Sequence, residues 1–420
     1  MQMSLSKAVA GAARDPWHLG PGELAPGPVA QGRPTWQVTR WPVSRSEYDR
    51  LVQAARQPDA MSLTASAAVA DTGTSVAAVP TVNDNLDGIP RTALEPPDPA
   101  LAVGLDDVMT AVNAQFAVTA KGSTAPLAPV PFSAMFGHVL PHDASFMFDP
   151  KLAYDHFAKR WIAIVGAKRE TPPGSWIMLA VSQTGDPRGL WYTWALDASL
   201  DGTTPTPHAL TVWTLKDPLA AWKTPPGSPV FAPVSVACQS YDLPPSAEQP
   251  GAGPRIATDD TRLLDAVYHG DGPTKGLWTT HTSKFTWPGD GEARSVVQWY
   301  QLDVAASKAV QQGRYGAPGI YQFFPAIQPI ASGDTFVVFG RSSATDFAHL
   351  RVAGRQAADP PNALSNSVVI QPGASVYPNT RWGDYFSVAI DPDDDGSAWM
   401  CGEYAGPAGA WATRICSVFF

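Results

Sequence analysis

Four charged residues stand at the start of similar short segments and could together do acid–base chemistry. Asp98, Asp149 and Asp384 each open an apolar run, and Arg262 opens another. If these segments stand side by side around one axis, the three carboxylates are neighbours and Arg262 lies opposite them. Crowded carboxylates repel one another, so one takes up a proton at a raised pKa or a cation such as Ca²⁺ neutralises them. Such a site would hold the polar or anionic end of a ligand at Arg262 and leave an aspartate pair as acid and base.

The same aspartates also allow a structural interpretation. An Asp before Pro commonly caps a turn by accepting hydrogen bonds from nearby backbone N–H groups, and Asp98 and Asp149 both precede a proline. A register error of one residue would also turn each side chain away from the axis. His281, on a predicted second strand, is a further candidate catalytic residue, although a lone histidine on a strand more often has a structural role.

An acidic turn near the C-terminus is the candidate metal site. The run Asp-Pro-Asp-Asp-Asp-Gly places Asp391, Asp393 and Asp395 at the alternate spacing with which calcium loops begin. The twelfth residue of such a loop is Gly402 here rather than Glu, which excludes an EF-hand. Two interpretations remain, a hairpin loop that binds Ca²⁺ and an acidic turn closed by Gly396.

The elements that would position these residues are short strands. Only 16% of the residues are charged, and 42 Pro and 35 Gly interrupt the chain every few residues, which favours strands and turns over long helices. Six segments that pair an apolar run with a second, aromatic and β-branched strand recur at a period slightly above that of known propeller repeats. They start at Asp98, Asp149, Pro207, Arg262, Phe324 and Asp384. We therefore predict an all-β, six-bladed β-propeller, with five or seven blades or a β-sandwich as alternatives.

Residues 1–94 differ in composition from the rest of the chain. This segment is rich in Pro, Gly, Ala and Ser, which predicts a partly disordered arm, and a capping box that begins at Ser44 predicts one short helix at about 44–57. The propeller is expected at 95–420. Its last unit shows three strands before the chain ends, so we expect an N-terminal segment to supply the missing outer strand and close the ring.

Two of the three cysteines could form a disulfide. Cys401 and Cys416 lie on the two arms of a predicted hairpin, and they face each other if Ala405 faces Ala412. Directly opposed cross-strand residues come close to disulfide reach. The alternative is that both are small buried residues, as we expect for Cys238.

Several blocks of residues between Asn83 and Phe420 form an ordered series. The most specific are Pro96-Pro97-Asp98 with Ala102-Val103-Gly104, Arg381-Trp382-Gly383-Asp384-Tyr385, and Trp411-Ala412-Thr413-Arg414-Ile415. The series resembles a family of secreted bacterial β-propeller proteins that largely lack an assigned function. The resemblance implies a secreted origin and a propeller related in shape to sialidases. The sialidase Asp-box turn is only partly present, at Asp394, Gly396 and Trp399, so sialidase catalysis is not implied.

The composition narrows the range of partners. A net charge of -9 without a basic stripe argues against nucleic acid, and no apolar run approaches the roughly 20 residues needed to cross a bilayer. We expect a monomer in the extracellular space or periplasm, with the cytoplasm as the alternative location.

The leading functional hypothesis is a propeller that binds a small-molecule or glycan-like ligand at the axial channel and cleaves or modifies it, with calcium bound. One alternative is a non-catalytic scaffold that docks a protein partner. Another is a specialised biosynthetic enzyme on a propeller fold. The sequence alone does not decide whether the protein is an enzyme.

Overall fold

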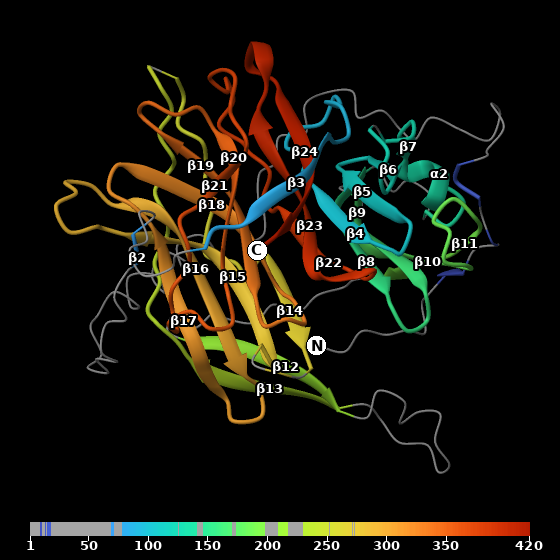
Figure 1. Cartoon of the computed structure of the whole chain (residues 1–420). Helices are drawn as coiled ribbons and strands as arrows, with labels where there is room; N and C mark the ends of the chain where they lie inside the picture. Colours follow the sequence, from blue (N-terminus) through green and yellow to red (C-terminus); the bar gives the residue numbers. More distant parts are fainter. Residues whose placement is uncertain are drawn as a thin grey trace.

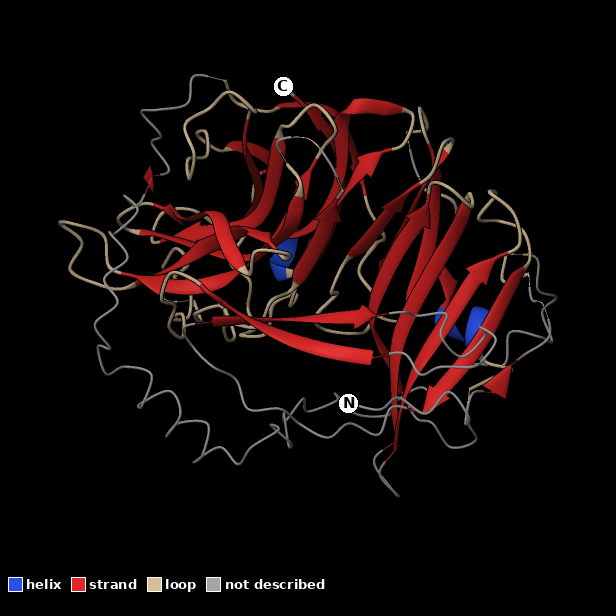
Figure 2. Cartoon of the chain, turned by 90° about the horizontal axis from the view of Figure 1, so that it is seen from below, coloured by secondary structure: helices blue, strands red, loops and turns tan. Residues whose placement is uncertain are grey.

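The computed structural model describes most of the chain from residue 78 onward. The described residues are 9–10, 13, 15–17, 69–70, 78–124, 126–140, 146–169, 174–197, 209–216, 230–251, 253–270, 272 and 274–420. The predicted helix at about 44–57 lies outside them, and the division of the chain at residue 94 stays a prediction. Within the described residues the structure is almost entirely strands and loops (Figure 2), and no helix is long and apolar enough to cross a membrane.

The strands form five sheets that follow one another along the chain (Figure 1), and we number them as blades 1 to 5. Blade 1 contains β4 (Ala100–Val103), β5 (Asp107–Val112), β6 (Gln115–Ala120) and β7 (Val130–Pro131), followed by the short helix α2 (Phe132–Phe136). Blade 2 contains β8 (Phe146–Asp155), β9 (Arg160–Arg169), β10 (Gly174–Ser182) and β11 (Trp191–Asp197), with β1 (Val9–Ala10) on its outer edge.

The remaining three blades have the same up-and-down order. Blade 3 contains β14 (Asp265–His269), β15 (Gly276–Phe285), β16 (Arg294–Asp303) and β17 (Lys308–Gly316), and β2 (Val69–Ala70) pairs with β17. Blade 4 contains β18 (Ile320–Pro329), β19 (Thr335–Ser343), β20 (His349–Arg355) and β21 (Val368–Gln371). Blade 5 contains β22 (Ser387–Asp391), β23 (Asp394–Ala405) and β24 (Trp411–Phe419), with the 3-10 turn η3 (Pro407–Gly409) between the last two.

The fourth strand of blade 5 comes from the N-terminal part of the chain. Strand β3 (Thr81–Asp87) pairs antiparallel with β24, with Leu86 opposite Ile415. The Asp84 backbone N–H also donates to Ser417 Oγ at 3.0 Å. The expectation that an N-terminal segment supplies the missing outer strand is therefore confirmed.

The predicted number of six blades is wrong, and five is the number in the structure. The segment predicted to begin a separate blade at Pro207 contains a two-stranded hairpin, β12 (Ala209–Lys216) and β13 (Val230–Ala237). This hairpin joins the outer edge of blade 3, where Ala237 pairs with Lys308 of β17. A lone hairpin buries too little apolar surface to be stable by itself, so it is added to an existing sheet edge.

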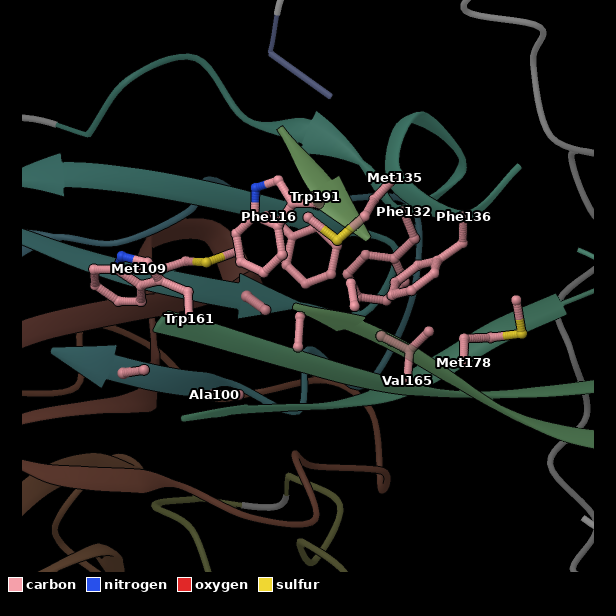
Figure 3. Packing of buried hydrophobic residues seen from close by; sticks show 14 of the residues in the cluster. Ala100, Met109, Phe116, Phe132, Met135, Phe136, Trp161, Val165, Met178 and Trp191 are labelled. Atoms are coloured by element: carbon pink, nitrogen blue, oxygen red, sulfur yellow. The ribbon is translucent and has the colours of Figure 1, made fainter. Parts of the chain in front are cut away.

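A large hydrophobic cluster between blades 1 and 2 shows how neighbouring blades pack. Figure 3 shows Met109 and Phe116 of blade 1 with Trp161 and Trp191 of blade 2, and all four are buried. Trp161 also covers Gly104, where a Cβ atom would lie 2.4 Å from its ring. Large aromatic side chains thus fill the space between blades.

The two cysteines of blade 5 do not face each other, so the predicted disulfide is wrong. Cys416 is opposite Met400, and Cys401 is opposite Ile415, because Ala405 pairs with Trp411 rather than with Ala412. This shift of one residue sends the two thiols to opposite faces of the sheet. All three cysteines are free and buried.

Candidate functional site

The same unusual backbone geometry occurs just before the first strand of blade 1 and at a bulge within the first strands of blades 2 and 4. Asp98, Asp149 and Phe324 each precede a proline and have φ of 49°, 53° and 51°, in the left-handed region that non-glycine residues rarely adopt. The preceding blade supports two of them, because Asp149 N–H donates to Asn113 Oδ1 and Phe324 N–H donates to Thr282 Oγ1, each at 2.9 Å. Phe324 has the same geometry without a carboxylate, so the strained backbone is a property of the fold. Blades 1 and 2 differ from blade 4 in having a carboxylate at this position.

Asp98, Asp149 and Asp384 lie in one hydrogen-bonded group. Asp98 Oδ1 accepts from the Asp384 backbone N–H at 2.6 Å, and Asp98 Oδ2 accepts from Asn113 Nδ2 at 2.7 Å. Asn113 in turn holds the Asp149 backbone N–H. The structure therefore brings together the three aspartates from blades 1, 2 and 5, although Asp98 also has the backbone-binding role of the structural interpretation. Whether they are catalytic stays a prediction.

Burial raises the pKa of all three carboxyls, and repulsion by a neighbouring aspartate adds to this at Asp98 and Asp384. The pKa of Asp98 rises from 3.8 to about 7, mainly through burial and then through the charge of Asp149. Burial also raises the pKa of Asp149, and burial followed by the charge of Asp98 raises that of Asp384 well above its usual value. Apolar side chains from the centre of the ring, among them Phe324 and Trp382, form the neighbouring hydrophobic cluster. Protonated and ionised carboxyls therefore coexist in this group near neutral pH.

Two arginines contact acids at this end of the ring. Arg381 forms ion pairs with Asp384 at 2.9 Å and with Asp259 at 3.0 Å. Arg262, the arginine predicted from the sequence, pairs instead with Asp260 at 2.9 Å and is exposed. The charge of Arg262 nevertheless lowers the pKa of Asp149. Arg381 lies in the segment Arg381–Tyr385 that resembles the bacterial propeller family, but the sequence did not predict its ion pair with Asp384.

Lys151 and Tyr385 lie beside the aspartates. The Lys151 ammonium lies 3.6 Å from the centre of the Tyr385 ring and donates to the Leu264 carbonyl at 3.2 Å. Tyr385 is buried and Lys151 is exposed, and burial lowers the pKa of Lys151. The Tyr385 hydroxyl is beside Asp149 and lowers its pKa, although outside the geometry of a full hydrogen bond. The sequence did not predict Lys151, because a bulge between Phe148 and Lys151 interrupts the alternation of side chains in β8.

Glu403 is a fourth carboxyl of the cluster that the sequence did not single out. Its Oε2 atom accepts from the Gly383 backbone N–H at 2.7 Å, and its Oε1 atom has no hydrogen-bond partner among the described residues. Burial raises its pKa well above the usual value. Gly383 is required here because a Cβ atom would lie 2.7 Å from Glu403 Oε2.

His281 is not in contact with the three aspartates in the part of the chain that the structure describes. One ring nitrogen, Nδ1, is 2.9 Å from the Thr282 carbonyl, and Nε2 is 2.9 Å from the Tyr300 hydroxyl. Burial lowers its pKa to about 4, so the ring is neutral at physiological pH. These contacts lie within blade 3 and match the structural role that the sequence gave as the alternative.

The acidic turn at Asp391 uses its first carboxylate within the fold. Asp391 Oδ1 accepts from the Asp393 backbone N–H at 2.9 Å and also pairs with Lys121, while Oδ2 accepts from Trp399 Nε1 at 2.8 Å. Over the described ranges, no three His, Cys, Asp or Glu side chains are arranged to hold a metal ion. Calcium bound by Asp391, Asp393 and Asp395 stays a prediction, and the contacts of Asp391 weigh against it.

Comparisons with known proteins give weak similarities only. No family model matches the chain, and no curated protein matches its sequence. Among solved structures, the GH93 α-L-arabinofuranosidase of Fusarium graminearum is 11% identical with a TM-score of 0.42, over 80% of this chain and 98% of that one. A protein of unknown function from Dyadobacter fermentans DSM 18053 is 8% identical with a TM-score of 0.32, over 81% and 99%.

An exo-1,5-α-L-arabinanase from a bovine ruminal metagenomic library is 11% identical with a TM-score of 0.30, over 76% of this chain and 91% of that one. Similarities of this size do not carry an argument about activity, and the propeller arrangement rests on the strand pairings themselves. The resemblance to secreted bacterial propellers, and with it the extracellular location, stays a prediction.

Proposed function

We propose that this propeller binds a glycan-like ligand at the aspartate cluster and cleaves a glycosidic bond there. One arrangement carries the proposal: carboxyls from three neighbouring blades, Asp98, Asp149 and Asp384, lie in one hydrogen-bonded group, and the raised pKa of Asp98, about 7, keeps this group partly protonated and partly ionised near neutral pH. A glycosidic bond needs this combination, because one carboxyl must give a proton while another accepts one.

The surroundings of each carboxyl suggest its role. Asp149 is partly exposed and has no ion-pair partner among the described residues, so it is the carboxyl placed to donate a proton to a ligand. Asp384 forms an ion pair with Arg381, whose charge lowers the pKa of Asp384 against the burial that raises it, and we assign Asp384 as the base. Asp98 is only 2% exposed and both of its oxygens accept hydrogen bonds, so it acts as a positioning residue that holds and tunes the other two.

The proposed reaction is a hydrolysis. Asp149 gives its proton to the glycosidic oxygen as the bond from that oxygen to the anomeric carbon breaks. A water oxygen forms the new bond to the anomeric carbon, and its proton passes to Asp384. The products are a free sugar and a free alcohol, and proton exchange with solvent restores both carboxyls.

The test is hydrolysis of a panel of 4-nitrophenyl glycosides by the wild type and by Asp149→Asn. The variant is expected to lose about 100-fold or more in kcat/KM, the usual contribution of a general acid. The loss should be much smaller with 2,4-dinitrophenyl glycosides, because that leaving group needs little protonation. Asp394→Asn, in an exposed turn, is the matched control.

Two results would refute the proposal. One is a wild type that neither hydrolyses the panel nor binds any of the parent sugars by calorimetry, which would favour the non-catalytic scaffold. The other is an Asp149→Asn variant that cleaves every glycoside as fast as the wild type, since the aspartate cluster would then have no part in the reaction.

A further inference from the structure

Lys151 is the cation of this site that forms no direct ion pair with a carboxylate among the described residues. Arg381 has Asp384 and Asp259 as ion-pair partners, and Arg262 has Asp260. Lys151 forms no ion pair among the described residues, and its ammonium contacts only a backbone carbonyl and the Tyr385 ring. Both contacts fix where the ammonium lies, and neither neutralises it. An exposed, positioned ammonium of this kind is ready to bind an anionic group.

Arg262 offers a second cationic group near Lys151. The Lys151 ammonium donates to the carbonyl of Leu264, which places it beside the segment that begins at Arg262. The charges of Lys151 and Arg262 both lower the pKa of Asp149. Asp260 binds Arg262 through Nε, at 2.9 Å from Oδ1, and so fixes the plane of the guanidinium. Asp259 is 3.9 Å from Nη2, too far for a hydrogen bond. The terminal nitrogens of an exposed guanidinium are therefore available to a ligand.

These two cations adjoin the carboxyl that we assign as the acid. If the anionic group of a ligand binds Lys151 and Arg262, the adjacent atoms of that ligand would lie at Asp149. The electrostatic environment also limits the charge of that ligand, since Asp149, Asp265 and Asp98 all lie near Lys151. A group with two negative charges would be repelled by these acids more strongly than a singly charged carboxylate. A planar carboxylate also matches the fork of a guanidinium.

We propose that the ligand of this site is an acidic sugar, whose carboxylate binds Lys151 Nζ and the terminal nitrogens of Arg262. This inference rests on the proposed function and adds the substrate class to it. A uronic acid residue has this chemistry, with a single carboxylate attached to the ring that also carries the glycosidic bond. The carboxylate then anchors the ring, and the glycosidic oxygen lies at Asp149.

The test measures binding by calorimetry and hydrolysis of matched acidic and neutral sugars. The probes are 4-nitrophenyl glucuronide and galacturonide, with the corresponding glucoside and galactoside as neutral partners. The variants are Lys151→Met, which keeps an unbranched side chain without the charge, and Arg262→Gln. Lys308→Met, which replaces an exposed lysine at the start of β17 in blade 3, is the control.

The wild type is expected to bind the acidic member of at least one pair about tenfold or more tightly than the neutral member, as a charge-assisted bond implies. Each site variant should remove about tenfold of this preference, because it weakens binding of the acidic sugar more than binding of the neutral sugar, and should reduce the salt dependence of binding. Lys308→Met should change none of these quantities.

Equal binding of acidic and neutral sugars by the wild type would overturn the inference. So would an unchanged preference in both Lys151→Met and Arg262→Gln. If neutral glycosides are still cleaved in an Asp149-dependent way, the proposed function survives and only the acidic substrate class fails. If no sugar of either kind binds, the proposed function fails as well.

Discussion

Replacing Asn113 should cost more stability than replacing any other single hydrogen-bonding side chain of the aspartate cluster. Its side chain joins three groups: Nδ2 donates to the Pro96 carbonyl at 2.8 Å and to Asp98 Oδ2 at 2.7 Å, and Oδ1 accepts from the Asp149 N–H at 2.9 Å. Asn113→Leu keeps the approximate volume and removes all three bonds. Asn113 is 2% exposed, so water does not readily replace them.

The expected loss follows from the number and kind of bonds. A neutral buried hydrogen bond contributes about 1 kcal/mol net, and one to a charged group about 2 kcal/mol, so the free energy of unfolding should fall by about 3 to 4 kcal/mol. The matched comparison is Thr282→Val, which removes the one equivalent bond to the Phe324 N–H and should cost about 1 kcal/mol. Urea denaturation followed by tryptophan fluorescence measures both values. If Asn113→Leu is no more destabilising than Thr282→Val, the network does not hold the cluster as described.

Two further predictions concern the pH dependence of stability and the packing between blades. Because the pKa of Asp98 rises from 3.8 to about 7 on folding, the folded protein keeps a proton that the unfolded chain has lost between those values. The free energy of unfolding should therefore decrease as pH rises from about 4 to 7, and Asp98→Asn should remove this part of the slope in urea titrations at several pH values; an unaltered slope would contradict the raised pKa. Gly104→Ala places a Cβ atom 2.4 Å from the Trp161 ring and should cost about 1 to 3 kcal/mol. Gly270→Ala, with nothing within 4 Å, should cost far less, and equal midpoints for the two variants would argue against the close packing of Trp161 on Gly104.

Local patterns were enough to predict the all-β class and the convergence of the three aspartates. Asp98 and Asp149 occupy equivalent places in similar segments, and similar segments around one axis bring equivalent positions together. The start of blade 5 is less regular, since Asp384 is not followed by a proline and joins the group through its backbone N–H. The sequence repeat predicted the position of Asp384, but it did not predict the hydrogen bond between Asp384 and Asp98.

The features that the sequence missed depend on contacts between distant segments. The hairpin that starts at Ala209 has the local pattern of a blade, and only its pairing with Lys308 shows that it extends blade 3. The pairing of Arg381 with Asp259 and the burial of Glu403 likewise depend on how separate loops meet. The cysteine error had a different cause, because the turn between β23 and β24 sets the register and one residue decides which face each thiol occupies.

The strand that completes blade 5 has a consequence for biosynthesis. Strand β3 is synthesised more than 300 residues before its partner β24. Until β24 has left the ribosome, the early strand has no edge to join, and its backbone N–H and C=O groups remain open to pairing with another chain. A nascent chain stalled before Trp411 would therefore hold the earlier blades in a ring that is not yet closed.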